Sequence, residues 1–172
     1  MTNTKYIASG GIAFSERKDL KQLKKFAAEG WLVKRYKGMG YELEQGEPEV
    51  VDYSIDIRHL APDEEDEYFS MFEFAGWEHV CSSYDTHLFK APVGTKSIYS
   101  DSKTKAEKLL RLQKSITPAL WMGSILTIIS YLLLLLMGGG IVFWVIFVIF
   151  LAFTFPCVLM YITLTIRRLR LN

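Results

Sequence analysis

An apolar tract from residue 116 to residue 166 constrains this chain more than any other feature. Only the triple glycine at 138–140 interrupts it, and the segments 116–137 and 141–166 contain no charged side chain over 22 and 26 residues. A helix rises about 1.5 Å per residue and a bilayer core is about 30 Å thick, so each segment can cross it. Two buried helices of a soluble protein would normally keep a polar face. We therefore predict two transmembrane helices that reverse direction at the glycines.

The charges beside these segments predict their orientation. A linker and juxtamembrane helix at 93–115 precedes the first segment, a tail at 167–172 follows the second, and the glycine turn between the segments is uncharged. Cationic flanks stay on the cytoplasmic side, so we expect both termini in the cytoplasm and a multi-pass protein of the cell membrane. Anionic lipid would attract this basic collar. Its members are Lys103, Lys105, Lys108, Arg111, Lys114, Arg167, Arg168 and Arg170.

The N-terminal part differs in composition from the tract. It shows no apolar run after a basic start, so we expect no signal peptide and a cytosolic location. Residues 1–100 carry 12 basic and 17 acidic side chains, a net charge of −5. Such an acidic segment argues against phosphate-driven binding of nucleic acid, and we expect none.

Residues 1–92 contain an internal repeat. The segment 25–31 matches the segment 71–77 at an offset of 46 residues, and both end in Gly-Trp after a phenylalanine four residues before the glycine. Strand-like runs precede each helical stretch, at 5–14 and 50–57, and two more follow it. We predict two strand–helix–strand–strand repeats, at about 5–46 and 50–92. They would form an α+β domain, ferredoxin-like in plan, with one antiparallel sheet or a pair of sheets.

The repeated Gly-Trp has a local explanation. A glycine just past a helix end adopts positive φ, and the next residue then packs against the residue three positions before the helix cap. This rule predicts that Trp31 stacks on Phe26 and that Trp77 stacks on Phe72. The predicted structural caps are Gly30, Trp31, Phe26, Gly76, Trp77 and Phe72.

Residues that could carry chemistry form no complete set. His79, Cys81 and His87 are close in sequence, and alternation along a strand would place the first two on one face, but three ligands without a fourth are a weak zinc signature. The acidic stretch from Glu42 to Asp56 is expected to be a solvated surface. No serine has a Gly-x-Ser-x-Gly context. We predict no catalytic, cofactor-binding or metal-binding residues and no cofactor.

The chain resembles an uncharacterised bacterial family. The repeated Phe-x-x-x-Gly-Trp, the Gly46-Glu47-Pro48 turn and the strand from Val51 to Asp56 carry the resemblance, which covers about residues 5–92. This domain-of-unknown-function family typically joins such a cytosolic module to C-terminal membrane helices. Its genes often lie beside those of PadR-type repressors, which implies regulated expression. The resemblance implies no catalytic residues.

Three functional hypotheses follow. The first is a non-enzymatic membrane-anchored protein whose cytosolic domain mediates protein interaction or regulation, with the lipid bilayer and an unidentified protein as partners. The second is an immunity or self-protection protein against a membrane-active peptide. The third is a small-molecule sensor or an enzyme. Sheet edges and small residues in the apolar segments also allow a homodimer.

Overall fold

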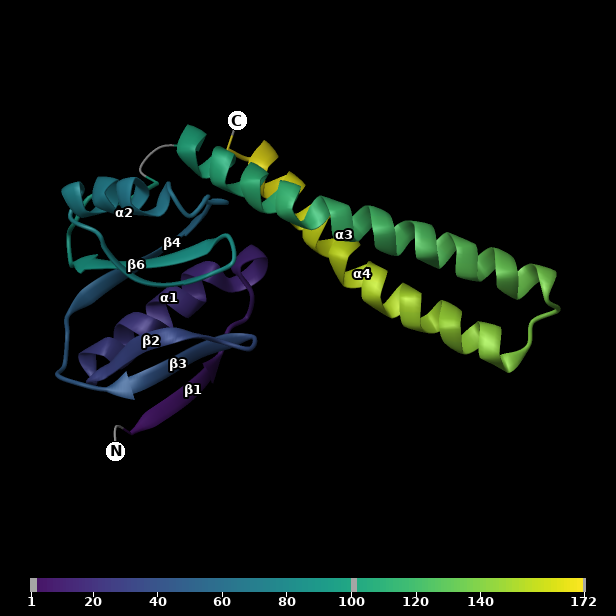
Figure 1. Ribbon diagram of the computed structural model, residues 1–172, viewed down its shortest axis with the longest axis horizontal. Coiled ribbons are helices and arrows are strands. Elements are labelled where there is room, and N and C mark those ends of the chain that lie inside the picture. The colour runs from purple at the N-terminus through teal and green to yellow at the C-terminus, as the bar shows by residue number, and fades with distance from the viewer. Residues whose placement is uncertain (1–2, 100–101, 172) are drawn as a thin grey trace. The chain divides into compact units, whose positions relative to one another are not determined.

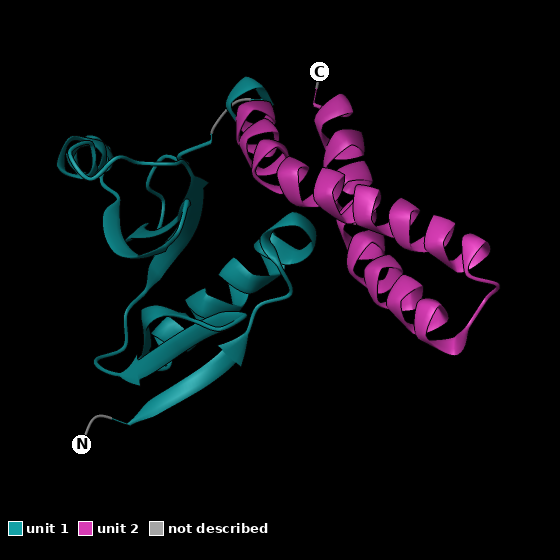
Figure 2. Ribbon diagram, turned by 45° about the vertical axis from the view of Figure 1, so that its right-hand side comes forward, with its two compact units in different colours: residues 1–104 teal, residues 105–172 magenta. Residues whose placement is uncertain are grey.

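The structure is a computed structural model that describes residues 3–99 and 102–171. The chain divides into two compact units, residues 1–104 and residues 105–172, which Figure 2 colours separately. Figure 1 labels the elements of both units except β5. In chain order they are β1 (Thr4–Ala8), α1 (Ile12–Ala28), β2 (Trp31–Lys37), β3 (Gly40–Gln45), β4 (Val51–Ile57), α2 (Glu65–Phe74), β5 (Glu78–Ser83), β6 (Thr86–Pro92), α3 (Ser102–Leu136) and α4 (Ile141–Leu169).

The first unit contains two antiparallel sheets of three strands, with strand orders β1-β3-β2 and β4-β6-β5. In both sheets the strand that comes last in sequence lies between the other two. The edge strands β2 and β5 lie side by side. The α+β class is thus confirmed, and of the two arrangements that the sequence left open the chain adopts the pair of sheets.

The two sheets also share an irregularity. The register between β2 and β3 shifts between Val33 and Arg35, and that between β5 and β6 shifts between His79 and Cys81. These bulges are 46 residues apart, as are the central-strand residues that face them. A bulge adds one residue to a strand and so ends the simple alternation of side chains between faces.

The first strand is shorter than the sequence predicted. β1 ends at Ala8, and α1 begins at Ile12 after a turn in which Gly11 has φ 88°. The expected strand from 5 to 14 is therefore wrong beyond residue 8. The reason is Asp19 of α1, which accepts hydrogen bonds from the Ser9 hydroxyl at 2.5 Å and from the Gly10 N–H at 3.0 Å. These bonds hold a strand-to-helix turn in place of the second half of the expected strand.

Each sheet packs against a helix. α1 contacts β2 of its own sheet and β4 of the other sheet, and buries Leu23 and Ala27 completely. α2 covers β5 and β6 through an aromatic cluster in which the Phe72 ring stacks on Phe89 with centroids 4.3 Å apart. The cluster comprises Tyr68, Phe72, Trp77, Phe89 and Ala91, with Leu60, Phe69 and Ile98 packed around it.

The second unit is a hairpin of two long helices. α3 ends at Leu136 and α4 begins at Ile141, and the turn between them has Gly138 at φ 72° and Gly139 at φ 78°. The Gly139 N–H donates to the Leu134 carbonyl at 3.0 Å, which closes the helix end. Reversal at the triple glycine is therefore as the sequence predicted. Both helices are long and apolar enough to span a membrane.

Polar side chains join the two helices of the hairpin. Near the middle, the hydroxyls of Thr127 and Thr154 lie 3.0 Å apart. Towards the chain end, the Gln113 amide donates to Thr165 at 2.9 Å and accepts from Arg168 at 3.2 Å. The start of α3 and the end of α4 therefore meet at the end of the hairpin opposite the glycine turn. This end carries the basic residues of the collar.

Candidate functional site

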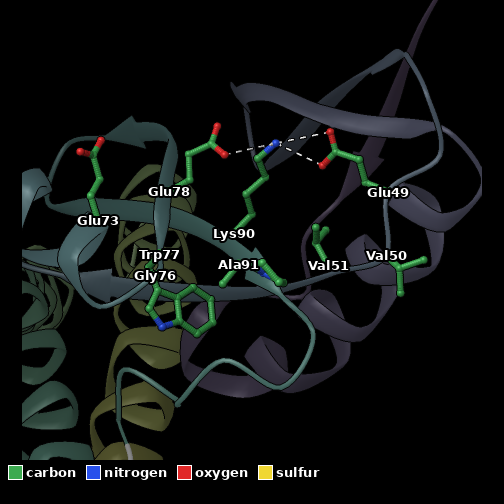
Figure 3. A pocket seen from close by; sticks show the side chains of 10 residues that line it. Glu49, Val50, Val51, Glu73, Gly76, Trp77, Glu78, Lys90 and Ala91 are labelled. Atoms are coloured by element: carbon green, nitrogen blue, oxygen red, sulfur yellow. Dashed lines mark hydrogen bonds and ion pairs between the residues drawn. The ribbon is translucent and has the colours of Figure 1, made fainter.

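A hollow of about 460 Å³ opens on the surface of the first unit, where α2, β4, β5 and β6 begin or end (Figure 3). Its lining combines an apolar floor with several charged side chains. The residues are Glu49, Val50, Val51, Glu73, Gly76, Trp77, Glu78, Lys90, Ala91 and Pro92. A volume of this size lies within the usual range of about 300–1,000 Å³ for ligand sites.

The end of α2 positions the tryptophan of the hollow. Gly76 has φ 82°, its N–H donates to Glu73 at 2.9 Å, and the Trp77 N–H donates to Phe72 at 2.9 Å. This pair of bonds defines a Schellman cap. The Trp77 indole N–H donates to the Lys96 carbonyl at 3.0 Å, and the residue is only 4% exposed. Trp77 is therefore a fixed part of the hollow.

Lys90 and two carboxylates form the charged centre of the hollow. The Lys90 ammonium lies 3.1 Å and 3.4 Å from the carboxylate oxygens of Glu49 and 3.6 Å from Glu78. The backbone N–H of Glu49 donates to Ala27 at 2.9 Å, which fixes the linker that carries this carboxylate. Glu73 adds a third carboxylate to the lining. The three carboxylates outnumber the ammonium of Lys90 in the lining, which leaves an excess of negative charge. In Figure 3 dashed lines join Lys90 to Glu49 and Glu78, and Glu73 lies apart from them.

The corresponding helix end of the first half is arranged differently. Gly30 has φ 83° and donates to Ala27 at 3.0 Å. The ammonium of Lys5 lies 4.2 Å from the Phe26 ring centre and 5.6 Å from the Trp31 ring centre. The aromatic pair that the sequence predicted to stack therefore shares a cation from β1.

The histidines of the second half do not gather with Cys81 as the strand pattern suggested. His79 stacks on Phe69 of α2 with ring centroids 4.0 Å apart. The bulge between His79 and Cys81 removes the expected same-face alternation. Burial raises the pKa of the Cys81 thiol to about 11, so it stays protonated at neutral pH. Within residues 3–99 and 102–171, no group of three His, Cys, Asp or Glu side chains could hold a metal ion.

His79 and His87 are instead joined through a serine. The Ser82 hydroxyl lies 2.7 Å from the His79 Nε2 and 2.7 Å from the His87 Nδ1. The His87 Nε2 lies 2.9 Å from the Arg58 carbonyl, which can only accept. A neutral His87 therefore donates to Arg58 and accepts from Ser82, and Ser82 accepts from His79. Burial, and then His87, lower the pKa of His79 and so favour its neutral form.

The acidic stretch in the first half serves as a set of ion pairs on the sheet. Glu42 accepts from Arg35 and Lys37, each at 2.5 Å, and Glu44 pairs with Lys34 at 2.7 Å. The hydrogen bond from Lys37, and then that from Arg35, lower the pKa of Glu42. These carboxylates are paired with basic side chains, which suits a structural role on the sheet face.

Sequence reasoning identified Trp77 but missed the hollow beside it. The helix-cap rule accounts for Trp77, whereas the acidic stretch that contains Glu49 indicates no partner for it. No local pattern marked Lys90. The hollow depends on the strand order β4-β6-β5, which brings Lys90 opposite Glu78.

The geometry defines an α+β domain with a charged hollow, followed by a helical hairpin that is long and apolar enough for a membrane. Comparison with known proteins adds a family. The profile of DUF2812, described as a protein of unknown function, matches residues 15–121, which is more than half of the 172 residues. The chain therefore belongs to this family. No curated protein and no solved structure matches the chain.

Proposed function

We propose that this chain is a two-span protein of the cell membrane whose N-terminal domain binds another protein without catalysing a reaction. The hollow beside Trp77 is the observation that carries this proposal, because it is concave, partly apolar and unbalanced in charge. The binding surface is the group of residues around Lys90, and the partner supplies a complementary basic segment. The two halves of the domain represent duplicated units on a ferredoxin-like plan.

The hairpin supports the membrane part of the proposal. Most of its large apolar side chains are exposed, as lipid contact requires. The Gln113–Thr165 and Gln113–Arg168 hydrogen bonds place the basic residues of both helices at one end. With that end in the cytoplasm, both termini face the cytoplasm and the glycine turn faces outward. The N-terminal domain is then held near the inner leaflet.

A photo-crosslinking experiment in native membranes tests the binding role. Val50 lines the hollow and is 73% exposed, whereas Met39 lies outside the lining, between β2 and β3, and is 85% exposed. A photoreactive amino acid at position 50 should give a protein adduct that the same amino acid at position 39 does not give. Equal adducts at both positions, or adducts at neither, would contradict the proposal.

A small-molecule sensor is the second candidate, and the volume of the hollow favours it. The same experiment separates the two functions. Crosslinking to a partner protein increases the mass of the chain by that of a polypeptide, whereas crosslinking to a metabolite increases it only by that of a small molecule.

A further inference from the structure

Lys90 occupies the centre of the hollow as a cation supplied by the chain itself. Its ammonium is shared between Glu49, which lies in the linker before β4, and Glu78, which begins β5. The Lys90 side chain is 23% exposed and the Glu78 side chain is 67% exposed, so solvent reaches both groups. The longer 3.6 Å separation from Glu78 makes that carboxylate the more weakly paired of the two.

The first half shows that this architecture holds a cation against its aromatic helix end. Lys5, on the edge strand β1, lies over Phe26 and Trp31 at distances typical of cation–π contacts. Lys5 lies opposite Leu43 in the first sheet. The residue 46 positions after Leu43 is Phe89, and Phe89 lies opposite Ser54 in the second sheet. Serine carries no charge, so Ser54 supplies no cation to the second helix end. The second half therefore lacks the cation that β1 supplies in the first.

We propose that the hollow receives a lysine or arginine side chain from a basic segment of the partner, and that Lys90 is an internal competitor which this side chain displaces. The inference rests on the proposed function and assigns Lys90 as the residue that sets the affinity. The incoming cation takes the position between Glu49 and Glu78. Its methylene stem lies along the apolar floor formed by Val51, Trp77 and Ala91.

Charge decides the class of ligand. The carboxylates of Glu49, Glu73 and Glu78 outnumber the ammonium of Lys90, so an anionic ligand would meet net repulsion. A cation meets Glu73 and Glu78 first, because both are exposed at the rim. Once it pairs with Glu49 as well, the flexible side chain of Lys90 moves into water at little cost.

The test measures peptide binding to the full-length chain in lipid nanodiscs of neutral composition. The probe is a fluorescent peptide of alternating lysine and leucine, compared with the same peptide carrying glutamate in place of lysine. Lys90→Met removes the internal cation. Lys34→Met is the matched control, because it removes one lysine from the Glu44 ion pair on the first sheet and changes the net charge equally.

We expect Lys90→Met to bind the lysine peptide about fivefold more tightly than the wild type, the upper range for a partly exposed ion pair. Lys34→Met should bind like the wild type, and Glu49→Gln/Glu78→Gln should bind more weakly by a similar factor. The peptide should also raise the melting temperature of Lys90→Met more than that of the wild type, which shows that the variant is folded.

Two results would overturn the inference in different ways. If the wild type binds the lysine peptide while Lys90→Met binds it equally or less tightly, Lys90 is not a competitor, and the proposed function survives. If neither protein binds the lysine peptide, or both prefer the glutamate peptide, a basic partner segment is excluded and the proposed function falls as well.

Discussion

Asp19 is a buried carboxylate that organises the connection between β1 and α1. The residue is 7% exposed, and it accepts hydrogen bonds from Ser9, from the backbone of Gly10 and from Ser15 at 3.3 Å. A side chain at Gly10 would collide with Ser15, since an added Cβ would lie 2.0 Å from its hydroxyl. The turn thus depends on a short residue at position 10 and an acceptor at position 19.

Replacing this acceptor should destabilise the domain. Asp19→Ala leaves the Ser9 hydroxyl and the Gly10 N–H without their acceptor, and we expect the free energy of unfolding to fall by about 2–3 kcal/mol. Urea unfolding of the chain in detergent micelles, followed by tryptophan fluorescence, measures this change. Asp63→Ala removes an exposed carboxylate of equal charge and should change stability by less than about 0.5 kcal/mol. Equal effects of the two substitutions would refute this role of Asp19.

His79 should make stability depend on pH. Its pKa is lowered in the folded state by burial and by His87, so the unfolded chain takes up the proton more readily. The contribution of His79 to the free energy of unfolding is therefore fully present above the unfolded pKa of about 6.5, and it is lost as the pH falls below that value. His79→Phe keeps a ring against Phe69 and should reduce the decline in melting temperature between about pH 7.5 and pH 5.

Val80→Ala provides the comparison for this pH measurement. Val80 is the next residue on the same strand and does not titrate. This variant should keep the wild-type slope of melting temperature against pH. A slope that is equally steep in His79→Phe would show that the histidine contributes nothing to it.

At the scale of secondary structure, the two Gly-Trp helix ends have nearly equal backbone geometry and unequal surroundings. Gly30 and Gly76 have φ of 83° and 82°. An added Cβ at Gly30 would lie 2.9 Å from the Gly46 carbonyl, whereas at Gly76 the nearest atom is a methyl of Thr95 at 3.4 Å. The chain after β3 therefore closes over the first helix end more tightly than the chain after β6 closes over the second.

This difference predicts unequal costs for the same substitution. Gly76→Ala should cost about 1 kcal/mol of unfolding free energy, because alanine resists positive φ. Gly30→Ala should cost at least about 1 kcal/mol more, because the Gly46 backbone must also move. Gly38 has φ 53°, and an added Cβ there would have no atom within 4 Å. Gly38→Ala therefore measures the cost of the backbone conformation alone and should resemble Gly76→Ala. Equal losses for Gly30→Ala and Gly76→Ala in urea unfolding would contradict the packing argument.

Local rules explain which elements the sequence could predict. Positive φ after a helix is a property of glycine, so both helix ends and the triple-glycine turn followed from residue type. The order of strands depends on contacts between distant residues, and no local pattern encodes it. The bulges and the hollow around Lys90 were missed for the same reason, since Glu49, Glu78 and Lys90 meet only after both sheet register and linker path are set.

For the molecule as a whole, the proposed function depends on the direction in which the hairpin crosses the membrane. α3 has 35 residues and α4 has 29, and each exceeds the length needed for a core of about 30 Å. The helical residues outside the apolar segments lie at the end of the hairpin where Gln113 bonds to Thr165 and Arg168. That end carries basic side chains, whereas the glycine turn carries none. The central claim is that the turn faces outward and the N-terminal domain faces the cytoplasm.

Labelling of single cysteines with a membrane-impermeant maleimide in intact cells tests this claim most directly. With Cys81 and Cys157 replaced by alanine, one cysteine is introduced as Gly140→Cys in the turn, where φ is −57°, or as Met39→Cys in the N-terminal domain. Gly140→Cys should be labelled in intact cells, and Met39→Cys should be labelled only after permeabilisation. Labelling of Met39→Cys in intact cells, or recovery of the unlabelled chain in the soluble fraction, would contradict the claim.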